Sequence, residues 1–74
     1  MTLRALIRRR VWDYGLTLQR ASIEAGLGKN AMFRMATGER VKLPLRTRAG
    51  VCRALDIAPE VLDEAIREEL AIRN

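Results

Sequence analysis

Four side chains between positions 29 and 34 carry the chemistry in this sequence that best fits a nucleic-acid base. They are Lys29, Asn30, Phe33 and Arg34. On a helix that turns by about 100° per residue they fall on one side, with Thr37 behind them. Cationic donors, an amide and a flat ring pair with guanine, adenine and the thymine methyl in the major groove. The pattern predicts a helix that reads DNA. The alternative is a solvated polar face, against which an exposed phenylalanine argues.

Residues 17–38 predict two short helices that would position these side chains. Thr17 can cap a first helix that ends at Ala25, and Gly26 follows where a left-handed residue is needed. Gly28 caps a second helix over 29–37. A helix, a three-residue turn containing glycine and a second helix is the spacing of a DNA-binding helix-turn-helix.

The second helix is also amphipathic, and its opposite side is apolar. Met32 and Met35, flanked by Ala31 and Ala36, fall on that side and are predicted to face the core. Gly38 stops the helix as Gly26 stops the first.

The stretch LT-x4-S-x3-GLGKNAMFRMATGER resembles the lambda-repressor-like (Xre/Cro) helix-turn-helix proteins of bacteria and phages. The similarity continues through Pro44 and Leu55 to the end of the chain. In that family the second helix is the recognition helix, so the resemblance assigns base reading to the four side chains above. The pattern positions are Leu16, Thr17, Gly26, Leu27, Met32, Met35 and Gly38.

Two positions depart from the family pattern. The family often places a phosphate-binding glutamine directly after the threonine, but this chain has Leu18 there, so the contact passes to Gln19 or Arg20, or is absent. Ser22 stands where alanine is usual, and its hydroxyl needs a hydrogen-bond partner.

A basic segment follows the second helix, in which Pro44 predicts a loop before the next helix. A chain leaving a recognition helix runs beside the DNA backbone, so this segment is predicted to contact phosphates. The alternative is a solvated basic loop. The full set of expected phosphate contacts is Gln19, Arg20, Thr37, Arg40, Lys42, Arg46 and Arg48.

The N-terminal segment predicts a helix over 3–14, capped by Thr2 and stopped by Gly15. Trp12 falls away from its apolar stripe. It could cover the C-terminal helix, meet a partner chain or lie on the surface. The run Arg8 to Arg10 is expected to be solvated. The apolar stripe is Leu3, Leu6, Ile7, Val11 and Tyr14.

A helix over 45–55 is expected to turn Leu45, Ala49, Cys52 and Leu55 inward. Cys52 then acts as a small buried hydrophobe rather than a nucleophile. Gly50 weakens this helix and marks a close helix contact.

The last predicted helix covers 59–72, with Pro59 at its first position. Its apolar residues span about half of the helical wheel, which is wider than the ~100° that one core needs. The family often dimerises through its last helix, and the wide face agrees with that. The expected dimer interface is Val61, Leu62, Ala65, Ile66 and Leu70.

Composition restricts the class of protein. Residues 1–48 carry 11 Lys or Arg against three acidic residues, whereas residues 49–74 carry three against six. A basic N-terminal part and an acidic C-terminal part suggest that one face of the protein is turned to a polyanion. With Cys52 alone and no histidine, disulfide frameworks, zinc fingers and histidine catalysis are excluded. No run reaches the length of a membrane span, and we expect a cytoplasmic protein.

These patterns predict an all-α domain over 1–74, a compact bundle of about five short helices. The predicted function is sequence-specific binding of double-stranded DNA by a homodimeric transcriptional repressor or regulator at an inverted-repeat operator, in a bacterial cell and encoded by a chromosome or a phage. No catalytic residue, cofactor, metal or small-molecule substrate is expected. The alternative is an antitoxin-like or phage-encoded protein-interaction module with the same fold.

Overall fold

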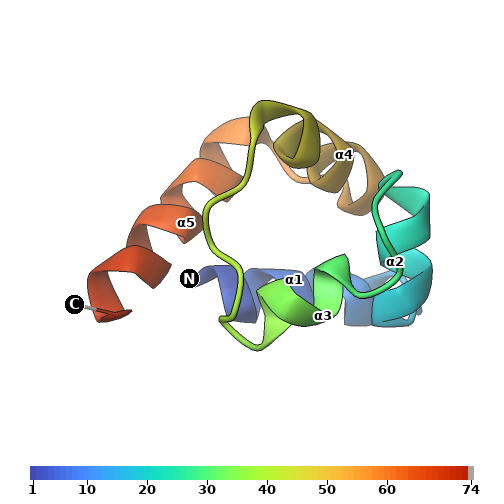
Figure 1. Ribbon diagram of the computed structural model, residues 1–74, viewed down its shortest axis with the longest axis horizontal. Helices are drawn as coiled ribbons and strands as arrows, with labels where there is room; N and C mark the ends of the chain where they lie inside the picture. The colour runs from blue at the N-terminus through green and yellow to red at the C-terminus, as the bar shows by residue number, and fades with distance from the viewer. Residues whose placement is uncertain (74) are drawn as a thin grey trace.

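A computed structural model describes residues 1–73, which form five α-helices and no strand (Figure 1). The all-α prediction is confirmed. No helix in this range is long and apolar enough to cross a membrane. In chain order the helices are α1 (Leu3–Asp13), α2 (Leu18–Glu24), α3 (Ala31–Ala36), α4 (Leu45–Leu55) and α5 (Pro59–Arg73).

Local sequence signals fix most helix ends. The Thr2 hydroxyl accepts from the Ala5 N–H at 3.3 Å, and the Thr17 hydroxyl accepts from the Arg20 N–H at 3.0 Å. Both predicted caps are therefore confirmed. The glycines after the first three helices all have positive φ, in the left-handed region where glycine carries no steric penalty.

The start of α3 differs from the prediction. The helix begins at Ala31 rather than at Lys29, and Lys29 and Asn30 lie in the turn before it. Asn30 is the N-cap residue, but its side chain makes no capping hydrogen bond. The chain between Gly28 and Ala31 closes a tighter turn, in which the Ala31 N–H donates to the Gly28 carbonyl at 3.1 Å.

The core lies around α1, which packs against both α3 and α5. Figure 1 shows α1 and α3 side by side along one edge of the molecule, with α4 across the opposite edge. α2 contacts α3 and α4, and α4 contacts α5, so the five helices close into a ring around the apolar centre. The largest fully buried apolar side chains are Leu3, Ile7, Met32, Met35, Leu55 and Leu62.

The rotation of α4 about its own axis was predicted wrongly. Leu45 is 82% exposed and Ala49 is exposed, whereas Cys52 is only half-buried. The cause is a close contact at Gly50, where a Cβ atom would collide with the carbonyl oxygen of Ala25. This contact confirms the close approach predicted for Gly50, and it turns another side of α4 inward. The residues buried on α4 are Thr47, Gly50, Val51 and Leu55.

Arg10 ties α1 to the link between α4 and α5. Its Nε donates to the Leu55 carbonyl at 3.1 Å, and its Nη2 donates to the Asp56 carbonyl at 2.6 Å. Arg10, which was predicted to be solvated, therefore stabilises the fold instead. Trp12, two residues further on, covers no other helix and is 83% exposed.

Glu69 is a fully buried carboxylate that joins α5 to the first turn of α1. It accepts from the Arg4 backbone N–H at 3.1 Å and from the Arg4 Nε at 2.9 Å. Burial by itself raises the pKa of Glu69, but the hydrogen bonds and charge of Arg4, aided by the charge of Arg73, outweigh burial and hold that pKa below its ordinary value. Arg4 satisfies a buried charge that would otherwise destabilise the fold.

We expect Glu69→Gln to lower the free energy of unfolding at neutral pH by about 1.5–3 kcal/mol, the range for hydrogen bonds to charged groups. Because the folded pKa lies below the unfolded one, the stabilisation is fully present above the unfolded pKa and is lost as pH falls through the folded pKa. The free energy of unfolding, measured with urea at a series of acidic pH values, should therefore fall less steeply with decreasing pH in the variant.

Glu68→Gln is the matched control, because the Glu68 carboxylate pairs with the terminal amine in a solvent-exposed position. Its cost should stay below about 1 kcal/mol. Equal losses in the two variants would contradict a special role for Glu69.

Candidate nucleic-acid interface

The outer side of α3 presents an aromatic ring and a guanidinium to solvent. Phe33 is 54% exposed and Arg34 is exposed, whereas Met32 and Met35 on the opposite side are fully buried. The predicted division of this helix into a core side and a solvent side is confirmed. Phe33 thus adds an apolar ring to a surface that otherwise carries polar and cationic side chains.

Lys29 and Asn30 lie beside this surface, although they precede the helix. They line a shallow hollow of about 210 Å³ together with Arg34 and Arg40. The Arg40 N–H also donates to the Arg34 carbonyl at 3.1 Å, which fixes the loop against the end of α3. The structure thus places Arg40, expected at a phosphate, next to the residues expected to read bases.

Ion pairing elsewhere in the molecule concentrates free positive charge in this region. Within residues 1–73 the structure has six ion pairs, which engage the carboxylates of Asp13, Glu24, Asp63, Glu64, Glu68 and Glu69. None of the ion pairs found in residues 1–73 involves a cation between positions 29 and 46, and Glu39 is the one acidic residue of that segment. The unneutralised cations there are Lys29, Arg34, Arg40, Lys42 and Arg46.

The predicted phosphate contacts divide into free and engaged residues. Lys42 and Arg46 are exposed. Arg48 is engaged: its Nε donates to the Leu43 carbonyl at 2.9 Å and its Nη1 lies 2.8 Å from the Asp63 carboxylate. Because these bonds tie the loop and α5 to α4, Arg48 serves the fold rather than an open basic surface.

At the start of α2, Gln19 and Arg20 are both exposed. The Arg20 Nε lies 3.0 Å from the Glu24 carboxylate, so its charge is partly neutralised. Thr37 is exposed at the end of α3, where its hydroxyl donates to the Arg34 carbonyl at 3.1 Å.

A second basic hollow, of about 550 Å³, lies between the loop after α3 and the end of α5. Arg40, Lys42 and Arg73 line it, with Glu39 as the opposing charge. Arg73 is absent from the predicted site. Its position at the C-terminal end of α5 could not be related to Lys42 by spacing along the sequence, because only the fold brings the two segments together.

Ser22 is the residue that holds α3 against α2. The side chain is fully buried, its hydroxyl donates to the Leu18 carbonyl at 2.9 Å, and it accepts from the Met32 N–H at 2.9 Å. The first turn of a helix has N–H groups without intrahelical partners, and here Ser22 satisfies one in place of the Asn30 side chain. The partner that the sequence required for this hydroxyl is therefore the backbone of α3.

The expected dimer interface on α5 is largely inaccessible. Leu62, Ala65 and Ile66 lie in the core of the chain itself, so they cannot meet a partner on its surface. Val61 is 50% exposed and Leu70 is half-buried. The wide apolar face of α5 is explained by its packing against α1 and α4, which approach it from two directions.

The thiol of Cys52 is not activated. Burial raises its pKa, and the carboxylates of Asp63 and Glu60 raise it further. Among residues 1–73, no group of three or more Cys, Asp or Glu side chains is placed to hold a metal ion.

Comparison with known proteins adds no relative: no family model, curated protein or solved structure matches this chain.

We expect Ser22→Ala to lower the free energy of unfolding by about 1–3 kcal/mol, because the Met32 N–H would stay buried without an acceptor. Hydrogen exchange measured by NMR should accelerate at the Met32 amide. Thr37→Ala is the control, since it removes an exposed hydroxyl at the other end of the same helix. Unchanged exchange at Met32 would show that the serine does not hold the start of α3.

Proposed function

We propose that this protein binds double-stranded DNA sequence-specifically, with α3 as the recognition helix of a helix-turn-helix. The observation that carries the proposal is the solvent side of α3, where Arg34 lines a shallow hollow with the free cations Lys29 and Arg40, and where the same helix also exposes the Phe33 ring. A purely solvated surface would not require the ring. A major-groove surface uses it against thymine methyl groups.

In this proposal the side chains divide by task. Arg34 donates its two-pronged guanidinium to guanine, and Asn30 pairs with adenine. Lys29 and Asn30 reach the bases from the turn before α3, because the helix begins only at Ala31. Lys42 and Arg46 hold phosphates, which fixes the orientation of α3 without reading sequence.

The biological role that follows is transcriptional regulation, most simply repression by occupying a promoter. We propose a homodimer in the cytoplasm of a bacterium, encoded by a chromosome or a phage. Two copies related by a two-fold axis would bind an inverted repeat with half-site centres about 10–10.5 base pairs apart, or a multiple.

The direct test is to select DNA from a random duplex pool with the purified protein and to sequence what is retained. The proposal expects an enriched motif with inverted-repeat symmetry. A pool without any enriched motif would contradict it and would favour the antitoxin-like interaction module instead.

Arg34→Ala should weaken binding to the selected site by about 1–3 kcal/mol and relax base preference at one or two positions. The measurement is titration against the selected site and against single-base variants. Arg67→Ala is the control, because Arg67 is an exposed arginine on α5 that pairs with Glu64. Equal weakening of Arg34→Ala on selected and random DNA would contradict base reading.

Lys42→Ala and Arg46→Ala should each weaken selected and random duplexes alike. Each lost phosphate contact should also reduce the slope of log affinity against log salt by about 1. A salt titration measures this, with Arg48→Ala as a contrast, because Arg48 is bound to Asp63 and its loss should mainly reduce stability. A slope that is unchanged in Lys42→Ala and Arg46→Ala would mean that these residues only face solvent.

A further inference from the structure

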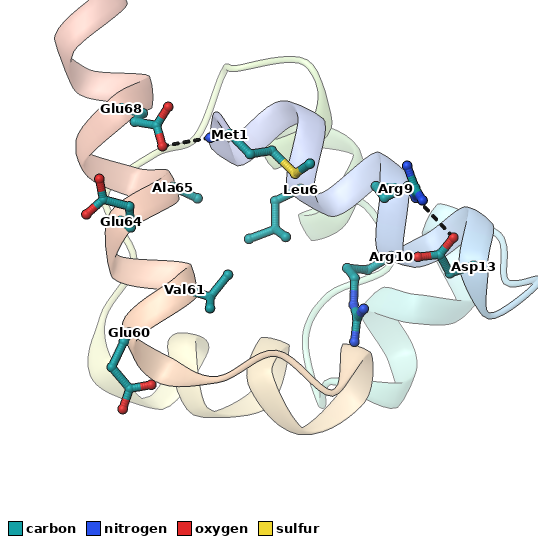
Figure 2. A pocket seen from close by; sticks show the side chains of 10 residues that line it. All are labelled: Met1, Leu6, Arg9, Arg10, Asp13, Glu60, Val61, Glu64, Ala65 and Glu68. Carbon is teal, nitrogen blue, oxygen red and sulfur yellow. Dashed lines mark hydrogen bonds and ion pairs between the residues drawn. The ribbon is translucent and has the colours of Figure 1, made fainter.

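An apolar groove of about 590 Å³ lies between α1 and α5 (Figure 2). Leu6 from α1 and Val61 from α5 point into it from opposite walls, and Met1 and Ala65 close one end. No described segment of the chain fills it. The residues proposed to contact DNA do not line it.

The α5 wall of this groove is acidic. Glu60, Glu64 and Glu68 follow one another along successive turns of α5 (Figure 2). Glu68 is 2.7 Å from the terminal amine and Glu64 is 2.9 Å from Arg67, whereas no ion pair to Glu60 is found within residues 1–73. The α1 wall carries Arg9 and Arg10, so an occupant should present a large apolar group to the groove and positive charge only toward the α5 wall near Glu60.

Trp12 has those properties. It is the only tryptophan of the chain and is 83% exposed, which leaves a large ring in water. At about 100° per residue on α1, Arg8 lies on one side of Trp12 and Arg9 on the other, between the ring and the groove. Arg9 is held 3.2 Å from Asp13, whereas no ion pair to Arg8 is found in the described chain.

The ring cannot reach the groove of its own chain, because it points away from the core side of α1. The groove of a second copy is accessible to the ring. Because the ring and the groove lie side by side on one surface, a two-fold axis between them places the ring of each copy opposite the groove of the other. With the axis near Arg9, the Arg8 side of one copy faces the α5 wall of the other. The same two-fold rotation therefore places the ring against the groove and Arg8 against the acidic α5 wall.

We propose that two copies of this chain associate by inserting the Trp12 ring of each into the α1–α5 groove of the other. The ring packs against the exposed Val61 of the partner copy, above the buried Leu6, and the indole N–H donates to a carboxylate of the α5 wall. Arg8 pairs with Glu60 or Glu64 of the partner copy. This places the contact on exposed residues and uses Val61, the exposed member of the α5 interface predicted from sequence. The association does not depend on DNA.

The first test is sedimentation equilibrium across a range of concentrations, together with the fluorescence of the sole tryptophan. The proposal expects a reversible dimer whose emission shifts to shorter wavelength as concentration rises, because each ring leaves water. A monomer with constant emission up to the highest soluble concentration would overturn the proposal. A monomer would also remove the homodimer from the proposed function, on which this inference rests, whereas an enriched motif in the DNA selection tests base reading separately.

Trp12→Ala and Val61→Glu should each weaken the dimer by at least about 30-fold, the effect typical of a buried aromatic contact at an interface. Both positions are exposed in the single chain, so the fold should be retained. The matched controls are Leu45→Ala, which removes another highly exposed apolar side chain, and Ile23→Glu, which places a charge at a position as exposed as Val61. Dimers of Trp12→Ala as strong as those of the controls would refute the contact.

A mixture of the two variants tests the reciprocal geometry. A dimer of either variant alone lacks both ring-in-groove contacts. In a mixed pair, the intact Trp12 ring of the Val61→Glu chain can enter the intact groove of the Trp12→Ala chain, so one contact is regained. The mixture should associate more tightly than either variant alone. If the two rings packed against each other instead, the mixture would show no gain, and the proposed arrangement would be wrong.

Discussion

The Ser22 hydroxyl is the contact on which the arrangement of α2 and α3 depends. A buried hydroxyl must be satisfied, and this one is bonded to the backbone of both helices. Because its acceptor capacity is used by the Met32 N–H, it fixes where α3 begins and how the helix is rotated. That rotation buries Met32 and Met35 and leaves Phe33 and Arg34 in solvent. The Ser22 hydroxyl, together with the buried apolar side of α3, thus orients the surface that we propose to bind DNA.

A second buried polar contact holds the other half of the molecule. Glu69 reaches from α5 to the first turn of α1, where it meets both the backbone and the guanidinium of Arg4. α1 therefore has its start fixed by α5, and Arg10 fixes its end to the link before α5. Both ends of α1 are thus bonded to other parts of the fold, and Trp12 and the α1–α5 groove lie on the exposed side of this helix.

The distribution of free charge on this protein depends both on where charged residues lie in the sequence and on which of them form ion pairs. The acidic residues of α5 are mostly engaged with nearby cations, whereas the cations between Lys29 and Arg46 have one acidic neighbour in their segment. Cations without an ion-pair partner consequently gather around α3, whereas of the three glutamates on the groove wall of α5 only Glu60 has no ion pair among residues 1–73. The two proposals rest on these separate surfaces, which lets one chain bind a polyanion and a second copy at the same time.

The sequence by itself determined the features that depend on near neighbours. Caps at Thr2 and Thr17, glycine stops, the proline that opens α5 and the two sides of α3 were all predictable, because each follows from contacts within one or two helical turns. The bounds of α4 were predicted for the same reason.

Only the tertiary structure decided which side of α4 and how much of α5 would be buried. The apolar stripe through Leu45 and Ala49 was as plausible in sequence as the one that is buried, and the choice came from Gly50 meeting the Ala25 carbonyl of another helix. The wide face of α5 likewise suggested a partner along its whole width, but α1 and α4 bury Leu62, Ala65 and Ile66 and leave Val61 exposed. The roles of Arg10, Arg48 and Glu69 were hidden because their partners lie far away along the chain, and periodicity carries no information about distant partners.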